Sequence, residues 1–160
     1  MDTLTVARAF FDACDFGKGW DGCKQFCHPD ASFETEAETL ANIDTLAIYC
    51  DWMIDALEML DKDVKVKVKA IAHDRDTDIV LIYGQIEGTV IIGPEPMPMK
   101  TDYVYALHFE DGKIRHVSKI WEFNISSPTL FPIFAMTDLT SLRNFHQSGS
   151  QIIYIFYQDS

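Results

Sequence analysis

The most informative stretch of this chain is TDYVYALHFEDGKIRHVSKIW, residues 101–121. Two runs of alternating residues flank an Asp-Gly pair, a pattern that predicts a β-hairpin. Residues two apart share one face of a strand, so each strand gathers a row of side chains. The rows are Tyr103, Tyr105, Leu107 and Phe109 on the first strand, and Arg115, Val117, Lys119 and Trp121 on the second. A lysine in such a row raises the question of whether the hairpin lines a core or a pocket.

Two further strands are predicted before the hairpin. They are VKVKVKAIA, residues 64–72, and IVLIYGQIEGTVII, residues 79–92, which both have the short period of a strand. Gly84 and Gly88 lie in the second of these, where glycine suits a bulge or a strong bend. GPEPMPMK, residues 93–100, is predicted to be a loop, because proline cannot take a place in a central strand.

The N-terminal half has helical periodicity instead. Residues 3–15 predict a helix that Thr3 caps, residues 20–27 a short second helix, and residues 43–60 a long helix that Asn42 caps. HPDASFETEA, residues 28–37, is typical of a turn that leads into a short strand. Helices followed by an antiparallel meander predict an α+β domain, in which the helices cover one face of a curved sheet.

Length and charge exclude several classes of function. The chain has 160 residues, typical of one domain, and carries 13 Lys and Arg against 25 Asp and Glu, a net charge of −12. This charge repels polyanions, so nucleic acid is not an expected partner. No stretch is long and apolar enough to cross a bilayer, and the first residues lack the pattern of a secretory signal. We therefore expect a cytoplasmic protein that binds neither nucleic acid nor membrane.

The four cysteines are expected to be reduced thiols in that compartment. Cys23 and Cys27 are four residues apart with His28 adjacent, but no second pair of ligands follows at the spacing of a structural zinc site. They are therefore predicted to be small buried residues, and no metal site is expected. The chain also has no phosphate loop, dinucleotide fingerprint or Ser-His-Asp order, so no cofactor is expected.

Three segments, HPDASFETEAETL, TLAIYCDWM and TDYVYALHFEDGKIRHVSKIW, resemble the SnoaL-like branch of the nuclear transport factor 2-like superfamily. The resemblance implies a cone, in which a strongly curved antiparallel sheet wraps three helices around an apolar pocket. It implies a domain over residues 1–123, followed by an extension of unknown role over residues 124–160. Many members form dimers through the outer face of the sheet, so a homodimer is expected.

The chain departs from the family's pattern after Trp121, and it differs from ketosteroid isomerases at two further positions. Relatives often continue the last strand with an Asn-Asp pair after the tryptophan, where this chain has Glu122 and Phe123. Thr35 lies about where the general base of ketosteroid isomerases is expected, and Tyr105 where their acidic oxyanion donor is expected. These two residues argue against steroid isomerisation.

The resemblance implies that the row that begins with Tyr103 points toward the pocket, as do Lys119 and Trp121. A buried lysine is costly without an acidic partner, a shifted pKa or a ligand. Lys119 is therefore either a site residue or a lysine whose stem packs inside while its head reaches the rim. The candidate catalytic residues are Lys119, Tyr105, Glu34 and Glu122. The candidate ligand-binding residues are Trp20, Tyr49, Trp52, Tyr103, Leu107 and Trp121.

Other interpretations remain open for these residues. The tyrosines also suit an aromatic core whose hydroxyls find a backbone partner, and Glu34 also suits a solvated strand face. The family includes polyketide cyclases, isomerases, dehydratases and epoxide hydrolases, alongside binding modules without catalysis. The resemblance thus implies binding of a small hydrophobic or aromatic, polyketide-like molecule, with cofactor-free cyclisation, isomerisation or dehydration as the chemistry. The alternative is a non-catalytic module for ligand binding or dimerisation.

Overall fold

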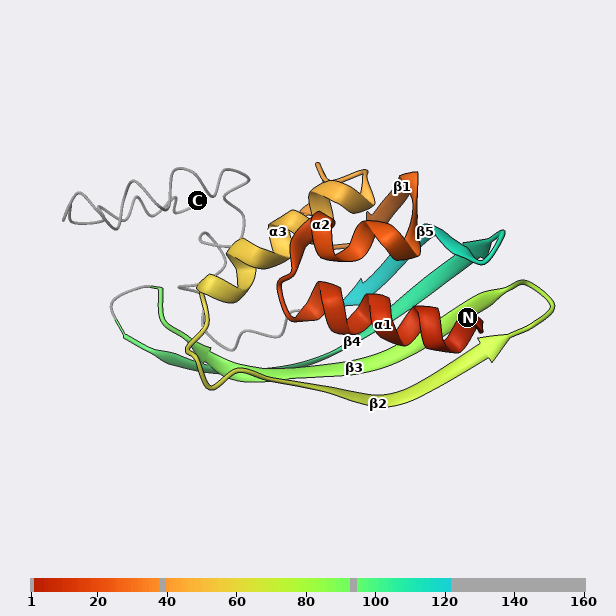
Figure 1. Ribbon diagram of the computed structural model, residues 1–160. Coiled ribbons are helices and arrows are strands. Elements are labelled where there is room, and N and C mark those ends of the chain that lie inside the picture. The colour runs from red at the N-terminus through yellow and green to blue at the C-terminus, as the bar shows by residue number, and fades with distance from the viewer. Residues whose placement is uncertain (1, 38–39, 93–94, 122–160) are drawn as a thin grey trace, which may run out of the picture.

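A computed structural model describes residues 2–37, 40–92 and 95–121. The helices are α1 (Thr3–Asp15), α2 (Gly19–Cys23), the 3-10 turn η1 (Lys24–Phe26) and α3 (Leu46–Glu58). The strands are β1 (Cys27–Thr35), β2 (Lys65–Asp74), β3 (Ile79–Val90), β4 (Met97–Glu110) and β5 (Lys113–Trp121). Figure 1 shows the α+β arrangement, with α1 and α3 lying across one face of a long, curved sheet.

The five strands form one open sheet in the order β1-β5-β4-β3-β2. The predicted antiparallel meander is present as β2, β3, β4 and β5. The short N-terminal strand was expected in an antiparallel sheet, but β1 pairs in parallel with β5, which makes the sheet mixed. The chain between β1 and β5 includes α3, and such a long connection allows two strands to pair in parallel.

Both long helices begin with a side-chain cap, although not the caps expected from the sequence. The Asp2 side chain accepts a hydrogen bond from the Thr5 backbone N–H, so Asp2 and not Thr3 caps α1. The Thr45 side chain accepts from the Ile48 backbone N–H, so Thr45 and not Asn42 caps α3. Short oxygen-bearing side chains satisfy the first free N–H groups of a helix, and several candidates stood near each start.

The hairpin between β4 and β5 turns where the sequence predicted. Asp111 and Gly112 both have positive φ, 50° and 75°, as a two-residue turn between twisted strands requires. One expected loop, in contrast, is a strand. Met97, Pro98 and Met99 belong to β4, where Pro98 lies opposite Thr89 of β3. Among the described residues, β4 pairs with β5 from Tyr103 onward, so Pro98 lies outside that part of the ladder.

The core lies between the helices and the inner face of the sheet. α1 buries a continuous face made up of Val6, Ala7, Phe10, Phe11, Ala13, Cys14 and Asp15. The sheet contributes alternate residues, among them Val80, Ile82, Tyr105, Leu107 and Val117. No helix in the described ranges is long and apolar enough to span a membrane. Glu122 and the predicted extension from residue 124 lie outside the described residues.

Candidate functional site

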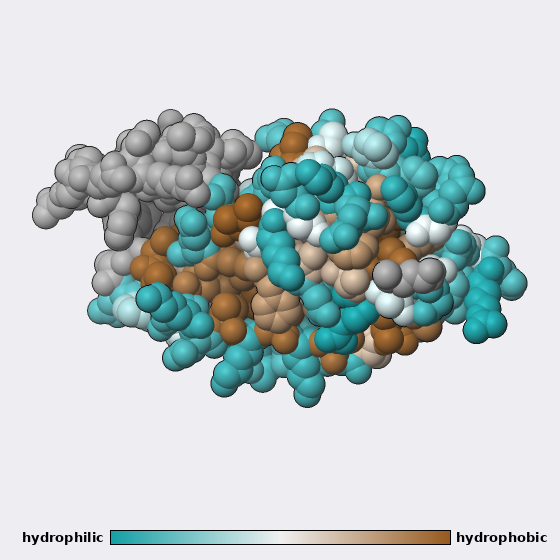
Figure 2. Space-filling view, viewed as in Figure 1, coloured by the Kyte–Doolittle hydropathy of each residue, from teal (hydrophilic) through white to brown (hydrophobic). Residues whose placement is uncertain are grey.

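A pocket opens between α3 and the sheet, where the helices leave part of the inner face uncovered. Its volume is about 40 Å³, or about 490 Å³ when all the space between atoms and the open solvent at its mouth are counted. Figure 2 shows apolar side chains gathered at the surface between α3 and the sheet. The lining residues are Asp15, Trp52, Met53, Ala56, Leu57, Leu60, Ile86, Met99, Tyr103, Lys119 and Trp121. Asp15 and Lys119 are the two charged residues among them.

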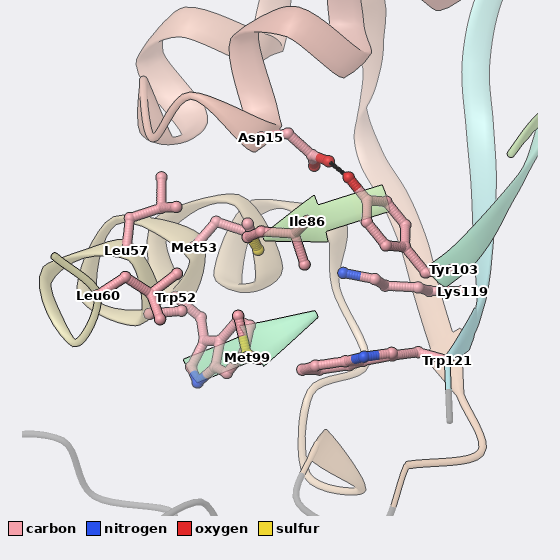
Figure 3. A pocket seen from close by; sticks show the side chains of 11 residues that line it. Asp15, Trp52, Met53, Leu57, Leu60, Ile86, Met99, Tyr103, Lys119 and Trp121 are labelled. Atoms are coloured by element: carbon pink, nitrogen blue, oxygen red, sulfur yellow. Dashed lines mark hydrogen bonds between the residues drawn. The ribbon is translucent and has the colours of Figure 1, made fainter. Parts of the chain in front are cut away.

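Asp15 is the last residue of α1, and only 2% of its surface is exposed. Its carboxylate accepts hydrogen bonds from the Tyr103 hydroxyl and, at 2.9 Å, from the Tyr105 hydroxyl (Figure 3 shows the first). Burial raises the pKa of Asp15, while the Lys119 charge and the two tyrosine hydroxyls oppose that rise. A carboxyl group with a raised pKa can both give and take a proton near neutral pH.

Lys119 lies on the inner face of β5, and 5% of its surface is exposed. Its Nζ donates a hydrogen bond to the Tyr49 hydroxyl at 2.7 Å. Four aromatic rings face the same nitrogen, with centroids 4.7 Å (Tyr103), 4.7 Å (Trp121), 4.9 Å (Tyr105) and 5.3 Å (Tyr49) away. Figure 3 shows the lysine stem between Tyr103 and Trp121. Burial lowers the pKa of Lys119, although the Asp15 charge opposes that change.

A chain of hydroxyl groups joins the two charged residues. The Tyr105 hydroxyl hydrogen is committed to Asp15, so Tyr49 is the donor in the 2.5 Å contact between Tyr49 and Tyr105. Tyr49 also lies 3.4 Å from the Met53 sulfur, which is a weaker acceptor than a phenol oxygen. The resulting order is Lys119, Tyr49, Tyr105, Asp15, with every hydrogen directed toward the carboxylate. Such an arrangement can pass a proton between the amine and the carboxyl group.

The Tyr103 ring occupies its position because the facing residue has no side chain. Gly84 of β3 lies opposite Tyr103 of β4. A Cβ atom added at Gly84 would lie 2.7 Å from the ring, closer than atoms of this kind approach in proteins. The glycine that the sequence assigned to a bend therefore also leaves room for a residue of the pocket.

The structure places the candidate residues at three depths. Lys119, Tyr103, Trp52 and Trp121 line the pocket. Tyr49 and Tyr105 are fully buried one layer behind it, where they form the hydroxyl chain. Leu107 is fully buried in the core and is not part of the lining.

Two other candidates lie elsewhere. Trp20 packs at the edge of the core, where its backbone N–H donates to Asp51 at 2.7 Å, and it is not among the lining residues. Glu34 points from β1 to the outer side of the sheet, and 67% of its side chain is exposed. It accepts a hydrogen bond from Ser118 at 2.6 Å, and this bond and that from His116 lower its pKa. Glu34 is therefore not placed to act as a base in the pocket. It lies on a solvated strand face, the alternative considered for it above.

Asp15 is the site residue that the sequence reasoning missed. The signal was present, because Asp15 follows Ala7 and Phe11 at intervals of four on the apolar face of the predicted helix. A carboxylate at such a position is buried when the helix packs, and a buried carboxylate needs donors. The predicted inward tyrosines were the available donors.

The cysteines meet in the core. The sulfur atoms of Cys14, Cys23 and Cys50 all lie within 4.8 Å of one another, and all four cysteines are buried and free. Of Cys23 and Cys27, the two cysteines four residues apart, Cys23 alone belongs to this cluster. We assign these thiols to core packing between α1, α2 and α3, a common role for buried cysteine.

Solved structures share this fold. AusH from Aspergillus nidulans superimposes with a TM-score of 0.61 at 14% identity, over 78% of this chain and 86% of that protein. AclR from Streptomyces galilaeus has a TM-score of 0.59 at 19% identity, over 89% and 92%. SalBIII, an epoxide hydrolase/cyclase-like enzyme of pyran ring formation in the polyether salinomycin, has a TM-score of 0.58 at 15% identity, over 75% and 90%. At these identities the likeness establishes the fold alone.

Sequence comparison with families gives a more specific result. No curated protein sequence matches this chain. A family model does match, that of the SnoaL-like domain, over residues 7–117. The match begins within α1 and ends at residue 117 in β5, so it includes Asp15 and the α3 wall but ends before Lys119. The chain belongs to the SnoaL-like domain family.

Proposed function

We propose that this protein binds a small apolar molecule in the pocket and catalyses proton transfer on it without a cofactor, as in a cyclisation, isomerisation or dehydration. One observation carries the proposal: a buried carboxyl group and a buried amine share an otherwise apolar pocket and are joined by two hydroxyl groups. Such a pocket buries a hydrophobic ligand and leaves few polar groups to orient it.

The two charged residues suit complementary roles. Asp15 has a raised pKa and Lys119 a lowered one, so both approach the pH range in which an acid or a base works well. In this proposal Lys119 donates to a ligand oxygen and Asp15 accepts a proton. The hydroxyl chain would then return the proton and restore both groups for the next cycle. SalBIII, one of the structural neighbours, is an epoxide hydrolase/cyclase-like enzyme.

Native mass spectrometry of freshly purified protein tests the binding part of this proposal. A small molecule that is released on denaturation would give the ligand class directly. The catalytic part is tested by turnover of that molecule, or of aromatic and polyketide-like ketones, by wild type and by Asp15→Asn. We expect a loss of activity of at least about 100-fold in the variant, the usual contribution of an acid–base group. Glu34→Gln is the matched control, because Glu34 lies outside the pocket.

A second candidate function is a non-catalytic module that dimerises. The observation in its favour is an apolar patch on the outer face of the sheet, where Tyr83, Val104 and Ile120 lie in register across three strands. Ile120 is 63% exposed, and Leu81 beside this row is 46% exposed. A second copy that covers the patch would make a homodimer. Sedimentation should then show a dimer that Ile120→Glu converts to monomer, with ligand binding retained.

A further inference from the structure

The chemical environment of Lys119 favours a nucleophilic amine. Among the described residues, Lys119 Nζ forms no ion pair with a carboxylate within 4 Å, and it donates its hydrogen bond to the Tyr49 hydroxyl. Burial lowers the pKa of the side chain, and each unit of lowering raises the neutral fraction at pH 7 about tenfold. A neutral lysine in an apolar pocket is the group that attacks carbonyl carbon.

We propose that Lys119 forms a Schiff base with an apolar aldehyde or ketone in this pocket. The inference rests on the proposed ligand pocket but adds a covalent step. Figure 3 shows the Lys119 nitrogen directed toward Ile86 and Met53, the side on which an apolar ligand would lie. The apolar walls also keep bulk water from the carbon–nitrogen bond, which slows its hydrolysis.

The hydroxyl chain provides the route for the protons. In the first step the Lys119 ammonium passes one proton through Tyr49 and Tyr105 to Asp15, which leaves a neutral amine and a neutral carboxyl group. The amine nitrogen then adds to the carbonyl carbon, and a proton moves from nitrogen to oxygen to give a carbinolamine. In the last step the carbinolamine oxygen takes the Asp15 proton and leaves as water. The products are an iminium on Lys119, one water molecule and the Asp15 carboxylate.

The pocket suits the product as well as the reactant. The iminium carries the same single positive charge as the ammonium that it replaces, so the net charge of the buried pair is unchanged. Four aromatic rings with centroids 4.7–5.3 Å from Nζ face that charge in both states. Attraction between a cation and aromatic faces increases when water is excluded, and the rings can stabilise the iminium as they stabilise the ammonium.

Reductive trapping tests the inference on the full chain. Wild-type protein is incubated at pH 7 with 2-naphthaldehyde and sodium cyanoborohydride, and the modified lysines are identified by peptide mass spectrometry. We expect one adduct per chain on Lys119, formed at least about ten times faster than adducts on exposed lysines such as Lys65. Lys119→Arg should remove that adduct and retain the others. Lys65→Arg is the matched control and should leave the Lys119 adduct unchanged.

Two further measurements separate the possible failures. Tyr49→Phe keeps Lys119 but breaks the hydroxyl chain, so the Lys119 adduct should form more slowly at an unchanged affinity for 2-naphthylmethanol, which cannot form an imine. If the alcohol binds in the pocket but Lys119 is labelled no faster than Lys65, the Schiff base is refuted and the proposed binding function stands. If neither compound binds in the pocket, both proposals fail.

Discussion

Asp15 and Lys119 are a buried pair of opposite charge that the structure joins through two tyrosine hydroxyls instead of a direct ion pair. Asp15 ends α1, Lys119 lies on β5, and Tyr105 and Tyr49 connect them with contacts of 2.9, 2.5 and 2.7 Å. Each charge is removed from water, and each is balanced by the other across this chain. Loss of either charge should therefore cost more than loss of both.

A double-mutant cycle measures this dependence. Lys119→Met leaves the Asp15 carboxylate buried without its compensating charge, so we expect a loss of about 3 kcal/mol in the free energy of unfolding. Asp15→Asn combined with Lys119→Met removes both charges and should restore most of that loss. Urea denaturation of the four proteins at pH 7 gives the coupling energy. Additive effects of the two substitutions would show that the residues do not balance each other.

The pH dependence of stability should reveal the raised pKa of Asp15. Its ordinary value is 3.8, and burial raises it in the folded chain. Above pH 3.8 the unfolded chain has lost this proton while the folded chain still holds it, so stability falls as pH rises through the folded pKa. The difference in unfolding free energy between wild type and Asp15→Asn should therefore decrease as pH rises above 3.8. An increase over that range would contradict the assignment.

Lys119 should act in the opposite pH direction. Burial lowers its pKa from the ordinary 10.5, so its contribution is fully present above pH 10.5 and is lost as pH falls through the folded pKa. Relative to Lys119→Met, wild type should gain stability as the pH is raised toward 10.5. Lys65→Met at the exposed edge strand is the control for general effects of removing a lysine, and should show no such gain.

The two tyrosines that donate to Asp15 should differ in their effect on stability, because Tyr105 also accepts a hydrogen bond from Tyr49. Tyr103→Phe and Tyr105→Phe each remove a hydrogen bond to the carboxylate, so both should raise the pKa of Asp15 further. Tyr105→Phe also removes the oxygen that accepts from Tyr49, and should cost about 1 kcal/mol more stability. Carbon-13 NMR titration of the Asp15 carboxyl group, with thermal unfolding, distinguishes them. Tyr83→Phe on the outer face should leave that titration unchanged.

Gly84 should be sensitive even to alanine. A Cβ atom there would lie 2.7 Å from the Tyr103 ring, so the ring that donates to Asp15 must shift. We expect Gly84→Ala to cost about 1–3 kcal/mol, the usual effect of overpacking, and to weaken binding in the pocket. Gly88→Ala is the matched control in the same strand, because the nearest atoms to its Cβ would be 3.4 Å away. Equal effects of the two substitutions on ligand binding would refute the role assigned to Gly84.

Much of the fold could be predicted because its signals are local. The Asp-Gly turn, the alternation of β3 and β5 and the apolar face of α1 each follow from residues that are close in the sequence. The caps were less certain, since Thr3 and Asn42 suit a helix start as well as Asp2 and Thr45 do. The strand status of Pro98 was missed because it depends on pairing with Thr89 of β3, which the sequence of residues 93–100 does not show.

The sequence by itself determined the α+β class, the inward row of tyrosines and the presence of a lysine that required explanation. Only the tertiary structure decided which residue balances the charge of that lysine. Periodicity assigns a side chain to a face, but it does not say which residues of α1, α3 and β5 meet across the core. That choice depends on how the curved sheet packs against the helices, and it brought Asp15, Tyr49 and Tyr105 to Lys119 while leaving Glu34 in solvent.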